Sequence, residues 1–239
     1  MSDDLKVLCL LDVLGFESLF KAIGLKELAG RYAKLTAYVK EQTGGLDIAP
    51  TPDGHVAVGW LVIGNTYFSD TLLLWTRYDK ISLPSFTQLT AETICYGLEN
   101  ELALRGTLSV GEMILNNDSG TYLGEPLIEA ARTVPLQRWI GVSFGCSFTK
   151  PDFNKGFYLN MVLPYKSHYK DQASSLATGM VVDWPRRWRE TRKIDIRPLV
   201  SGMDTDPQFS EYYRETLAFV DFSEHNHDWF KRQSHLDYG

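Results

Sequence analysis

The apolar and polar positions of this chain follow two patterns, one typical of buried strands and one typical of helices. Between Lys6 and Leu11 the residues are almost continuously apolar, which is typical of a strand covered on both faces of a sheet. From residue 16 to about residue 43 the apolar positions recur at helical spacing, and Gly24 is expected to divide this stretch into two helices. The same two patterns predict further strands over 55–63, 67–75, 103–110 and 141–148, and helices over 84–102 and 126–140.

Turn-forming residues separate these elements. The segment 48–54 contains proline, aspartate and glycine, which predicts a loop. Gly64-Asn65 is a dipeptide typical of a hairpin turn, so that Asp70 is expected near this turn, on the strand that returns from it. A second cluster of turn formers, at 116–120, predicts another loop.

The predicted order through residue 148 is β-α-α-β-β-α-β-loop-α-β. This order predicts an α+β fold of the ferredoxin-like kind, with helices flanking a mainly antiparallel central sheet. Beyond residue 149 the pattern weakens, and we expect only short strands at 156–163 and 179–182 and a short helix at 209–219. We therefore expect a core over 1–150, and an extension over 151–239 that completes or covers the core within the same domain.

Composition and charge exclude several classes of function. The formal net charge of −6 argues against general nucleic-acid binding, which needs a cationic surface, but not against a small nucleotide pocket. The three cysteines form no CxxC pair, which argues against a disulfide framework or a zinc site. The first apolar stretch is short, contains Asp12 and follows no basic segment, so it does not resemble a signal peptide. Without an apolar run of about 18 residues we expect no membrane span and a cytoplasmic location.

Asp12 is the first candidate for chemistry. It ends an apolar strand and precedes a predicted helix, where an aspartate commonly caps the helix. The alternative is a metal ligand beside a helix N-terminus, whose amides bind phosphate and where Gly15 allows a ligand to approach the backbone closely.

Asp70 favours the metal alternative. It precedes the apolar run TLLLW, and a carboxylate there is costly unless a cation neutralises it. If neighbouring strands bring Asp12 and Asp70 together, the two carboxylates repel each other unless a cation lies between them. Mg²⁺ or Mn²⁺ with triphosphate oxygens would satisfy this arrangement.

Four segments together resemble the class III nucleotidyl cyclases. The segment LDVLGF at 11–16 resembles the first metal strand of this family, and SDTLLL at 69–74 resembles its second metal hairpin. The segment LRGTLSVG at 104–111 resembles the R-x-G-x-x-x-G strand, and GEPLIEAAR at 124–132 resembles the G-x-x-x-N-x-A-A-R helix. Each motif is weak alone, but all four occur in the family's order within residues 6–148.

The resemblance implies a two-metal site. Asp12 and Asp70 would hold two divalent ions, Mn²⁺ or Mg²⁺, with the carbonyl of Val13 as a further ligand. One ion would activate the ribose 3′-hydroxyl for attack on the α-phosphorus, and the other would neutralise the triphosphate, with pyrophosphate leaving in line. The β- and γ-phosphates would bind the backbone amides of the following turn: Leu14, Gly15, Phe16 and Glu17.

The resemblance also assigns roles to two arginines, each of which a surface ion pair would otherwise explain. Arg105 would contact the terminal phosphates, and Arg132 would stabilise charge on the transferring phosphoryl group. In this family the site forms between two catalytic domains, and this chain resembles one. It is therefore expected to act as a homodimer with two shared sites, in which Arg132 reaches the metal pair of the partner.

The residues that read the base differ from the family pattern. Thr66 stands where a purine-selecting lysine is usual, Thr121 stands at the second base-reading position, and Ile128 replaces the asparagine of the helix motif. The chain therefore resembles the pyrimidine nucleotide cyclases of bacterial anti-phage (Pycsar) signalling, whose cyclic UMP or cyclic CMP product acts on a separate effector. We favour UTP over CTP, with the threonine hydroxyls contacting the base edge.

Two alternatives remain open from sequence. The loss of the asparagine at Ile128 favours a degenerate cyclase that binds a nucleotide without turning it over, whereas both aspartates and Arg132 are retained. A nucleic-acid module built on WPRRWRETR, residues 184–192, could stack bases. For this segment we favour a partly buried strand edge or dimer contact with a solvated basic face.

Overall fold

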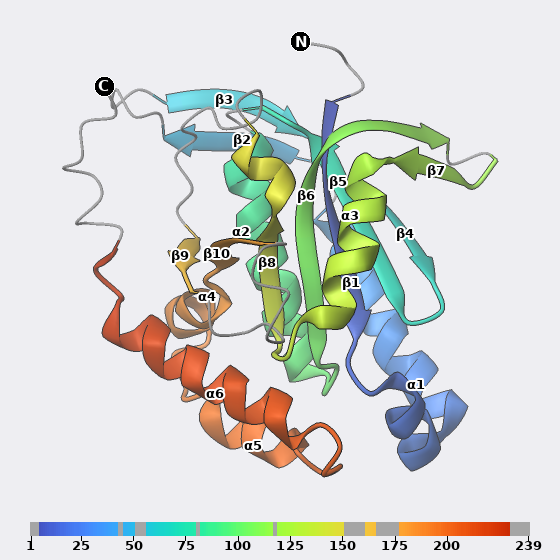
Figure 1. Cartoon of the computed structure of the whole chain (residues 1–239), viewed down its shortest axis with the longest axis vertical. Helices are drawn as coiled ribbons and strands as arrows, with labels where there is room; N and C mark the ends of the chain where they lie inside the picture. The colour runs from blue at the N-terminus through green and yellow to red at the C-terminus, as the bar shows by residue number, and fades with distance from the viewer. Residues whose placement is uncertain are drawn as a thin grey trace.

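The protein is built around one large mixed sheet, flanked by helices (Figure 1). The computed structural model describes residues 5–42, 45–50, 56–79, 82–116, 119–150, 161–165 and 177–229. The strand order in the sheet is β4-β5-β1-β6-β8-β10-β9, with β7 paired to β6. Among the described strands of this sheet, only β6 and β8 run parallel to each other, so the sheet is mainly antiparallel.

The first part of the chain forms a β-α-β-β-α-β unit. Strand β4 neighbours β5, β5 neighbours β1, and β1 neighbours β6, all antiparallel, which is the arrangement of a ferredoxin-like fold. The predicted α+β class is confirmed. The elements of this unit are β1 (Leu5–Val13), α1 (Phe16–Glu41), β4 (Gly64–Phe68), β5 (Thr71–Arg77), α2 (Ser82–Glu99) and β6 (Leu104–Asn116).

Additional elements extend this unit at several points. A separate two-stranded sheet of β2 (Gly45–Pro50) and β3 (Val56–Leu61) is inserted between α1 and β4. Beyond β6 the chain forms β7 (Thr121–Gly124), α3 (Glu125–Thr133), a 3-10 turn η1 (Val134–Leu136), β8 (Gly141–Gly145) and a second 3-10 turn η2 (Cys146–Thr149). The remaining elements are β9 (Val162–Pro164), β10 (Ala177–Val182), α4 (Trp184–Thr191), α5 (Arg197–Met203) and α6 (Ser210–His225).

Side chains of β1 alternate between two hydrophobic clusters on opposite faces of the sheet. Val7, Cys9 and Leu11 are fully buried in the larger cluster, which includes apolar residues of α1 and α2. Leu8 and Leu10 belong to the second cluster, with Ala130 of α3. Because side chains alternate along a strand, Asp12 continues the face of Leu8 and Leu10.

The predicted kink in the first helix is confirmed. Gly24 has the non-helical angles φ 77° and ψ 164° inside α1, so the helix axis is broken there. The second half of α1 then turns a stripe of buried residues towards the core: Leu28, Leu35 and Val39.

The predicted hairpin turn at Gly64-Asn65 is wrong. Both residues lie on β4, and the chain reverses at Ser69-Asp70, between Phe68 and Thr71. Gly64 is instead required by packing, because a Cβ there would lie 2.1 Å from the indole of Trp75. The correction places Asp70 in the turn itself.

Other boundaries also differ. Residues 48–50 belong to β2 rather than to a loop, and 51–54 lie outside the described part of the chain. The helix predicted to residue 140 ends at Thr133, because Pro135 has no amide hydrogen to continue the helical ladder. The strand predicted to residue 148 ends at Gly145, and α5 was not predicted. Of the strand predicted at 156–163, the structure describes only the end, where β9 begins.

The segment 184–192 forms helix α4 rather than a strand edge. Its two tryptophans, Trp184 and Trp188, are buried, and Arg187 binds Glu92 at 2.6 Å. Arg192 binds both Glu92 and Glu99. The indoles are therefore not free to stack on bases, which removes the basis of the nucleic-acid alternative. Among the described residues, no helix combines the length and apolar character needed to cross a bilayer.

Candidate functional site

The structure brings Asp12 and Asp70 together at one end of the sheet. Asp12 pairs with Thr71, so Asp70 lies one residue beyond the paired strands, and its carbonyl accepts a hydrogen bond from the amide of Val13 at 3.2 Å. Burial raises the pKa of Asp12, and the nearby Asp70 carboxylate raises it further, whereas Arg105 lowers it. The two acidic side chains, 58 positions apart in sequence as numbered, therefore share one electrostatic site.

Arg105 holds the Asp12 carboxylate from the neighbouring strand β6. Its Nε and Nη2 donate to Oδ2 of Asp12 at 3.1 and 3.0 Å, and its Nη1 donates to the carbonyl of Gln137 at 3.3 Å. The guanidinium also lies 5.9 Å from the centre of the Tyr212 ring. Arg105 is therefore fixed from three sides, beside the carboxylate pair rather than in solvent.

The turn after Asp12 has the shape of an anion-binding helix start. Gly15 adopts a left-handed conformation, φ 66° and ψ 29°, which an L-residue with a side chain rarely adopts. The amide of Leu14 donates to the carbonyl of Ala103 at 2.8 Å, and Leu19 begins the helical ladder by donating to Gly15. No side chain caps the helix, so the amides of its first turn keep no protein partner from a cap.

The side chains of the next two residues of this turn contact other residues of α1. The ring of Phe16 packs edge-on against Tyr32, with centroids 6.0 Å apart. The carboxylate of Glu17 is exposed and binds Lys21 at 2.6 Å, which offsets its negative charge next to an expected phosphate site. The two side chains are thus engaged elsewhere, and only their amides are candidates for phosphate binding.

The donors at this site fit a divalent cation that is completed by ligand oxygens. In the described ranges, no three histidine, cysteine, aspartate or glutamate residues are grouped as a metal site, so Asp12 and Asp70 would act as a pair. Mg²⁺ and similar ions are commonly held by one or two carboxylates together with substrate phosphates. The hydroxyl of Tyr32 supports this fit, because it is buried, has no hydrogen-bond partner in the described part of the chain, and interacts with the charges of both aspartates.

The other predicted site residues lie apart from this pair. Thr66, on β4, pairs with Leu73, which pairs with Leu10, so it faces the same side of the sheet as Asp12. Thr121 pairs with Asn116 at the far end of β6 from Arg105, and its hydroxyl accepts a hydrogen bond from Ser119 at 2.8 Å. The structure does not bring Thr121 to the carboxylate pair of its own chain.

The arginine of α3 points to solvent. Arg132 lies in the last turn of α3 and is exposed, with no hydrogen bond or ion pair to another residue of the described part. Ile128, one turn earlier, has 52% of its surface exposed. Neither side chain is buried within the described part of its own chain.

The C-terminal helices form a wall beside the site that the sequence did not predict. The ring of Phe209 covers the turn at Gly15, since a Cβ on Gly15 would lie 3.0 Å from it. Glu211 binds Arg138 at 2.5 Å, and the ring of Tyr212 faces the guanidinium of Arg105. The sequence signal for this wall is the aromatic cluster at 209–213. Its contacts with Gly15 and Arg105 are not predictable from that cluster, because both residues lie far away in the sequence.

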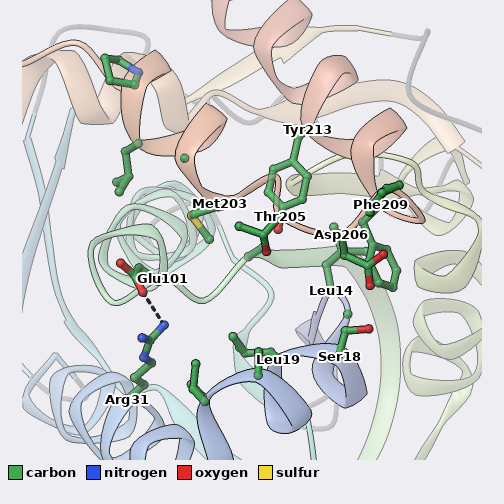
Figure 2. Close-up of a pocket in the computed structure, with 18 residues that line it drawn as sticks. Leu14, Ser18, Leu19, Arg31, Glu101, Met203, Thr205, Asp206, Phe209 and Tyr213 are labelled. Atoms are coloured by element: carbon green, nitrogen blue, oxygen red, sulfur yellow. Dashed lines mark ion pairs between the residues drawn. The ribbon is translucent and has the colours of Figure 1, made fainter.

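A cavity of about 750 Å³ separates α1 from this wall. Figure 2 shows Leu14, Ser18 and Leu19 on one side and Met203, Phe209 and Tyr213 on the other, with the Arg31–Glu101 ion pair at one end. The cavity borders the turn at Gly15, but neither Asp12 nor Asp70 lines it. It therefore flanks the candidate site without containing the carboxylates.

The chain resembles some solved structures. No family model matches the sequence, and no curated protein matches it. Seventeen chains of solved structures do match. One of them is a bacterial light-regulated adenylyl cyclase, with 14% sequence identity and a TM-score of 0.36 over 61% of this chain and 44% of that one. This chain thus spans less than half of that protein, and a likeness of this extent carries no conclusion about its activity.

Proposed function

We propose that the protein is a nucleotide cyclase that converts a pyrimidine nucleoside triphosphate, UTP in preference to CTP, into the 3′,5′-cyclic monophosphate and pyrophosphate. The observation that carries the proposal is the meeting of Asp12 and Asp70 beside the uncapped start of α1, with Arg105 bound to Asp12. These groups supply, at one place, acidic ligands for divalent ions, amides for phosphate and a fixed cation.

Each group has a distinct task in this reaction. Divalent ions, when bound, would favour loss of the 3′-hydroxyl proton and neutralise the triphosphate. Asp12 and Asp70 would hold these ions, and the amides from Gly15 to Glu17 would bind the β- and γ-phosphates, whereas the amide of Leu14, also expected there, already donates to Ala103. Arg105 would turn from Asp12 to the terminal phosphates, because its planar fork of donors suits both partners.

The reaction would take place in a homodimer. Phe68, Ile114, Leu123 and Ile128 are large apolar residues with 82%, 65%, 58% and 52% of their surfaces exposed. They lie on β4, β6, β7 and α3, and Figure 1 shows β4, β7 and α3 on one side of the molecule. A two-fold contact through this side would bury these residues and bring the exposed Arg132 to the carboxylate pair of the partner.

The base would be read by short hydroxyls. Thr66 faces the same side of the sheet as Asp12, and a threonine hydroxyl can donate to or accept from the edge of a pyrimidine. Thr121 would reach the base only across the two-fold contact, since it lies far from the carboxylates of its own chain. The cyclic pyrimidine nucleotide would then act as a second messenger in bacterial anti-phage defence, on a separate effector.

The decisive experiment is product identification. The protein is incubated with Mn²⁺ and an equimolar mixture of UTP, CTP, ATP and GTP, and the products are identified by mass spectrometry. We expect cyclic UMP as the main product, and no product from Asp70→Asn, which preserves the size of the side chain. Cyclic CMP alone would revise the base, and the absence of every cyclic product would overturn the cyclase proposal.

A second candidate is a nucleotide-binding protein without turnover. The observation that favours it is Ile128, which stands where the family has an asparagine and is exposed instead of packing in the core. This candidate predicts Mn²⁺-dependent binding of a triphosphate with no cyclic product. Equilibrium dialysis with labelled UTP, run beside the product assay, distinguishes the two.

A further inference from the structure

The hydroxyl oxygen of Tyr32 forms no hydrogen bond within the described part of the chain. It is also buried from solvent. A buried hydroxyl without a partner costs about 1–3 kcal/mol relative to one that is hydrogen-bonded. Native proteins leave few such groups, and each one calls for an explanation.

The position of Tyr32 results from the kink in α1. Beyond Gly24, the helix turns the stripe of Leu28, Leu35 and Val39 towards the core, and Tyr32 lies on the same stripe, one turn after Leu28. Its ring packs against Phe16, at the start of the same helix. The second half of α1 therefore returns Tyr32 to the turn that follows Asp12.

The charges that act on this hydroxyl belong to the proposed metal ligands. After burial, the negative charges of Asp70 and then Asp12 are the causes that raise the pKa of Tyr32. Among the described residues, the side chain of Asp70 interacts with the Asp12 carboxyl and with the Tyr32 hydroxyl, and no basic residue binds it. The unpartnered hydroxyl of Tyr32 is therefore a candidate donor to the Asp70 carboxylate.

We propose that Tyr32 is a positioning residue for Asp70, which donates its hydroxyl hydrogen to the Asp70 carboxylate when a divalent cation binds. Carboxylates that bind metal ions are commonly oriented by a hydrogen bond from a neighbouring group, and loss of that group typically weakens metal binding about 10–100-fold. The inference rests on the proposed metal site of Asp12 and Asp70, but not on the identity of the base or on cyclisation.

The test is Tyr32→Phe, measured without nucleotide. Binding of Mn²⁺ alone is followed by electron paramagnetic resonance, which detects the free ion, with Asp70→Asn defining binding that does not involve the site. We expect Tyr32→Phe to bind Mn²⁺ about tenfold more weakly than the wild type. At the same time its metal-free melting temperature should be equal or higher, because the variant removes an unpaired buried hydroxyl.

Tyr38→Phe is the matched control. Tyr38 lies on the same half of α1, but its ring stacks on Tyr96 and its hydroxyl interacts with Glu92, away from the aspartates. This variant should leave Mn²⁺ affinity unchanged.

Either of two results would overturn the inference. If Tyr32→Phe binds Mn²⁺ as tightly as the wild type, or if the wild type shows no binding that depends on Asp70, Tyr32 does not position a metal ligand. Failure of the proposed function is distinguishable, because intact Mn²⁺ binding without any cyclic product would reject the cyclase and retain the role of Tyr32.

Discussion

Arg105 donates two hydrogen bonds to a single oxygen of Asp12, Oδ2, at 3.1 and 3.0 Å. The guanidinium therefore supplies the positive charge beside the Asp12 carboxylate, which the proposed reaction assigns to a metal ion. Both side chains are mostly buried, with 15% and 19% of their surfaces exposed, so solvent does not screen the pair strongly.

The first prediction follows from this pair. Arg105→Ala should lower the free energy of unfolding of the metal-free protein by about 2 kcal/mol, because it leaves a buried carboxylate beside Asp70 without a cation. Urea unfolding measures this change. Added Mn²⁺ should raise the stability of the variant more than that of the wild type, since the ion replaces the lost positive charge. An equal effect of Mn²⁺ on both proteins would show that the ion does not bind at Asp12.

The second prediction concerns the shared sites of the proposed dimer. Asp70→Asn and Arg132→Ala should each abolish product formation, and an equal mixture of the two should regain about a quarter of the wild-type rate. Half of the dimers in the mixture are heterodimers, and one of their two sites has all its groups. Steady-state rates after mixing and re-equilibration of the subunits measure this.

A mixture of Asp12→Asn and Asp70→Asn is the control for this experiment. Both aspartates of one site come from the same chain, so no heterodimer of this kind has a complete site and no activity should return. Activity in Arg132→Ala alone would show that this arginine is not required.

Much of this site could be predicted because its elements are local patterns. The apolar run before Asp12 has the features of a buried strand, and Gly15 before a helical pattern indicates the turn. The turn at Asp70 was misplaced because Gly64-Asn65 matches a hairpin dipeptide, whereas Gly64 is in fact required by the indole of Trp75. A requirement set by a side chain on the neighbouring strand has no signature within a short window of sequence.

The sequence patterns did not predict contacts between segments that are far apart in the chain. The wall formed by Phe209 and Tyr212 depends on how α6 docks on the turn and on Arg105, and no periodicity encodes that docking. The segment around Trp184 and Trp188 was expected at a strand edge because of its tryptophans. It forms a helix in which Asp183 caps the N-terminus and both indoles face the core.

The third prediction tests the close packing of the central strands. A Cβ on Gly106 would lie 2.4 Å from the carbonyl oxygen of Leu10 and 2.6 Å from a methyl group of Leu11, both on β1. Gly106→Ala should therefore destabilise the protein by about 2–3 kcal/mol, since the strand backbone must move to relieve the overlap. Urea unfolding followed by circular dichroism measures this.

Gly30→Ala is the comparison for this variant. Gly30 lies within α1, and a Cβ there meets no atom within 4 Å, so the alanine should stabilise the helix by about 0.5–1 kcal/mol. Equal effects of the two substitutions would show that the packing around Gly106 adapts without cost.

The fourth prediction is a pH dependence that arises away from the site, at Asp183. This residue caps α4 by accepting from the amide of Arg186 at 3.3 Å, and it also accepts from the hydroxyl of Ser223. Burial raises its pKa, against the opposing effects of the Ser223 hydrogen bond and of Arg189. The folded protein therefore binds a proton here more readily than the unfolded chain does.

The sign of the effect follows from this difference. The contribution of Asp183 to stability is fully present below the ordinary aspartate pKa of about 3.9, and it is lost as the pH rises through the raised value in the folded protein. Asp183→Asn removes the titration and keeps a capping oxygen. The stability of the wild type minus that of Asp183→Asn should therefore fall as the pH rises above about 4, as measured by urea unfolding at each pH.

Asp195→Asn should show the opposite slope. The amide of Arg197 donates to Asp195 at 3.1 Å and lowers the pKa of its carboxyl, so the wild type gains stability over this variant as the pH rises through the acidic range. If the Asp183 difference rose with pH, as the Asp195 difference should, the raised pKa of Asp183 would be contradicted. The buried carboxylate would then have to be stabilised as an anion by Ser223 and Arg189 more strongly than burial disfavours it.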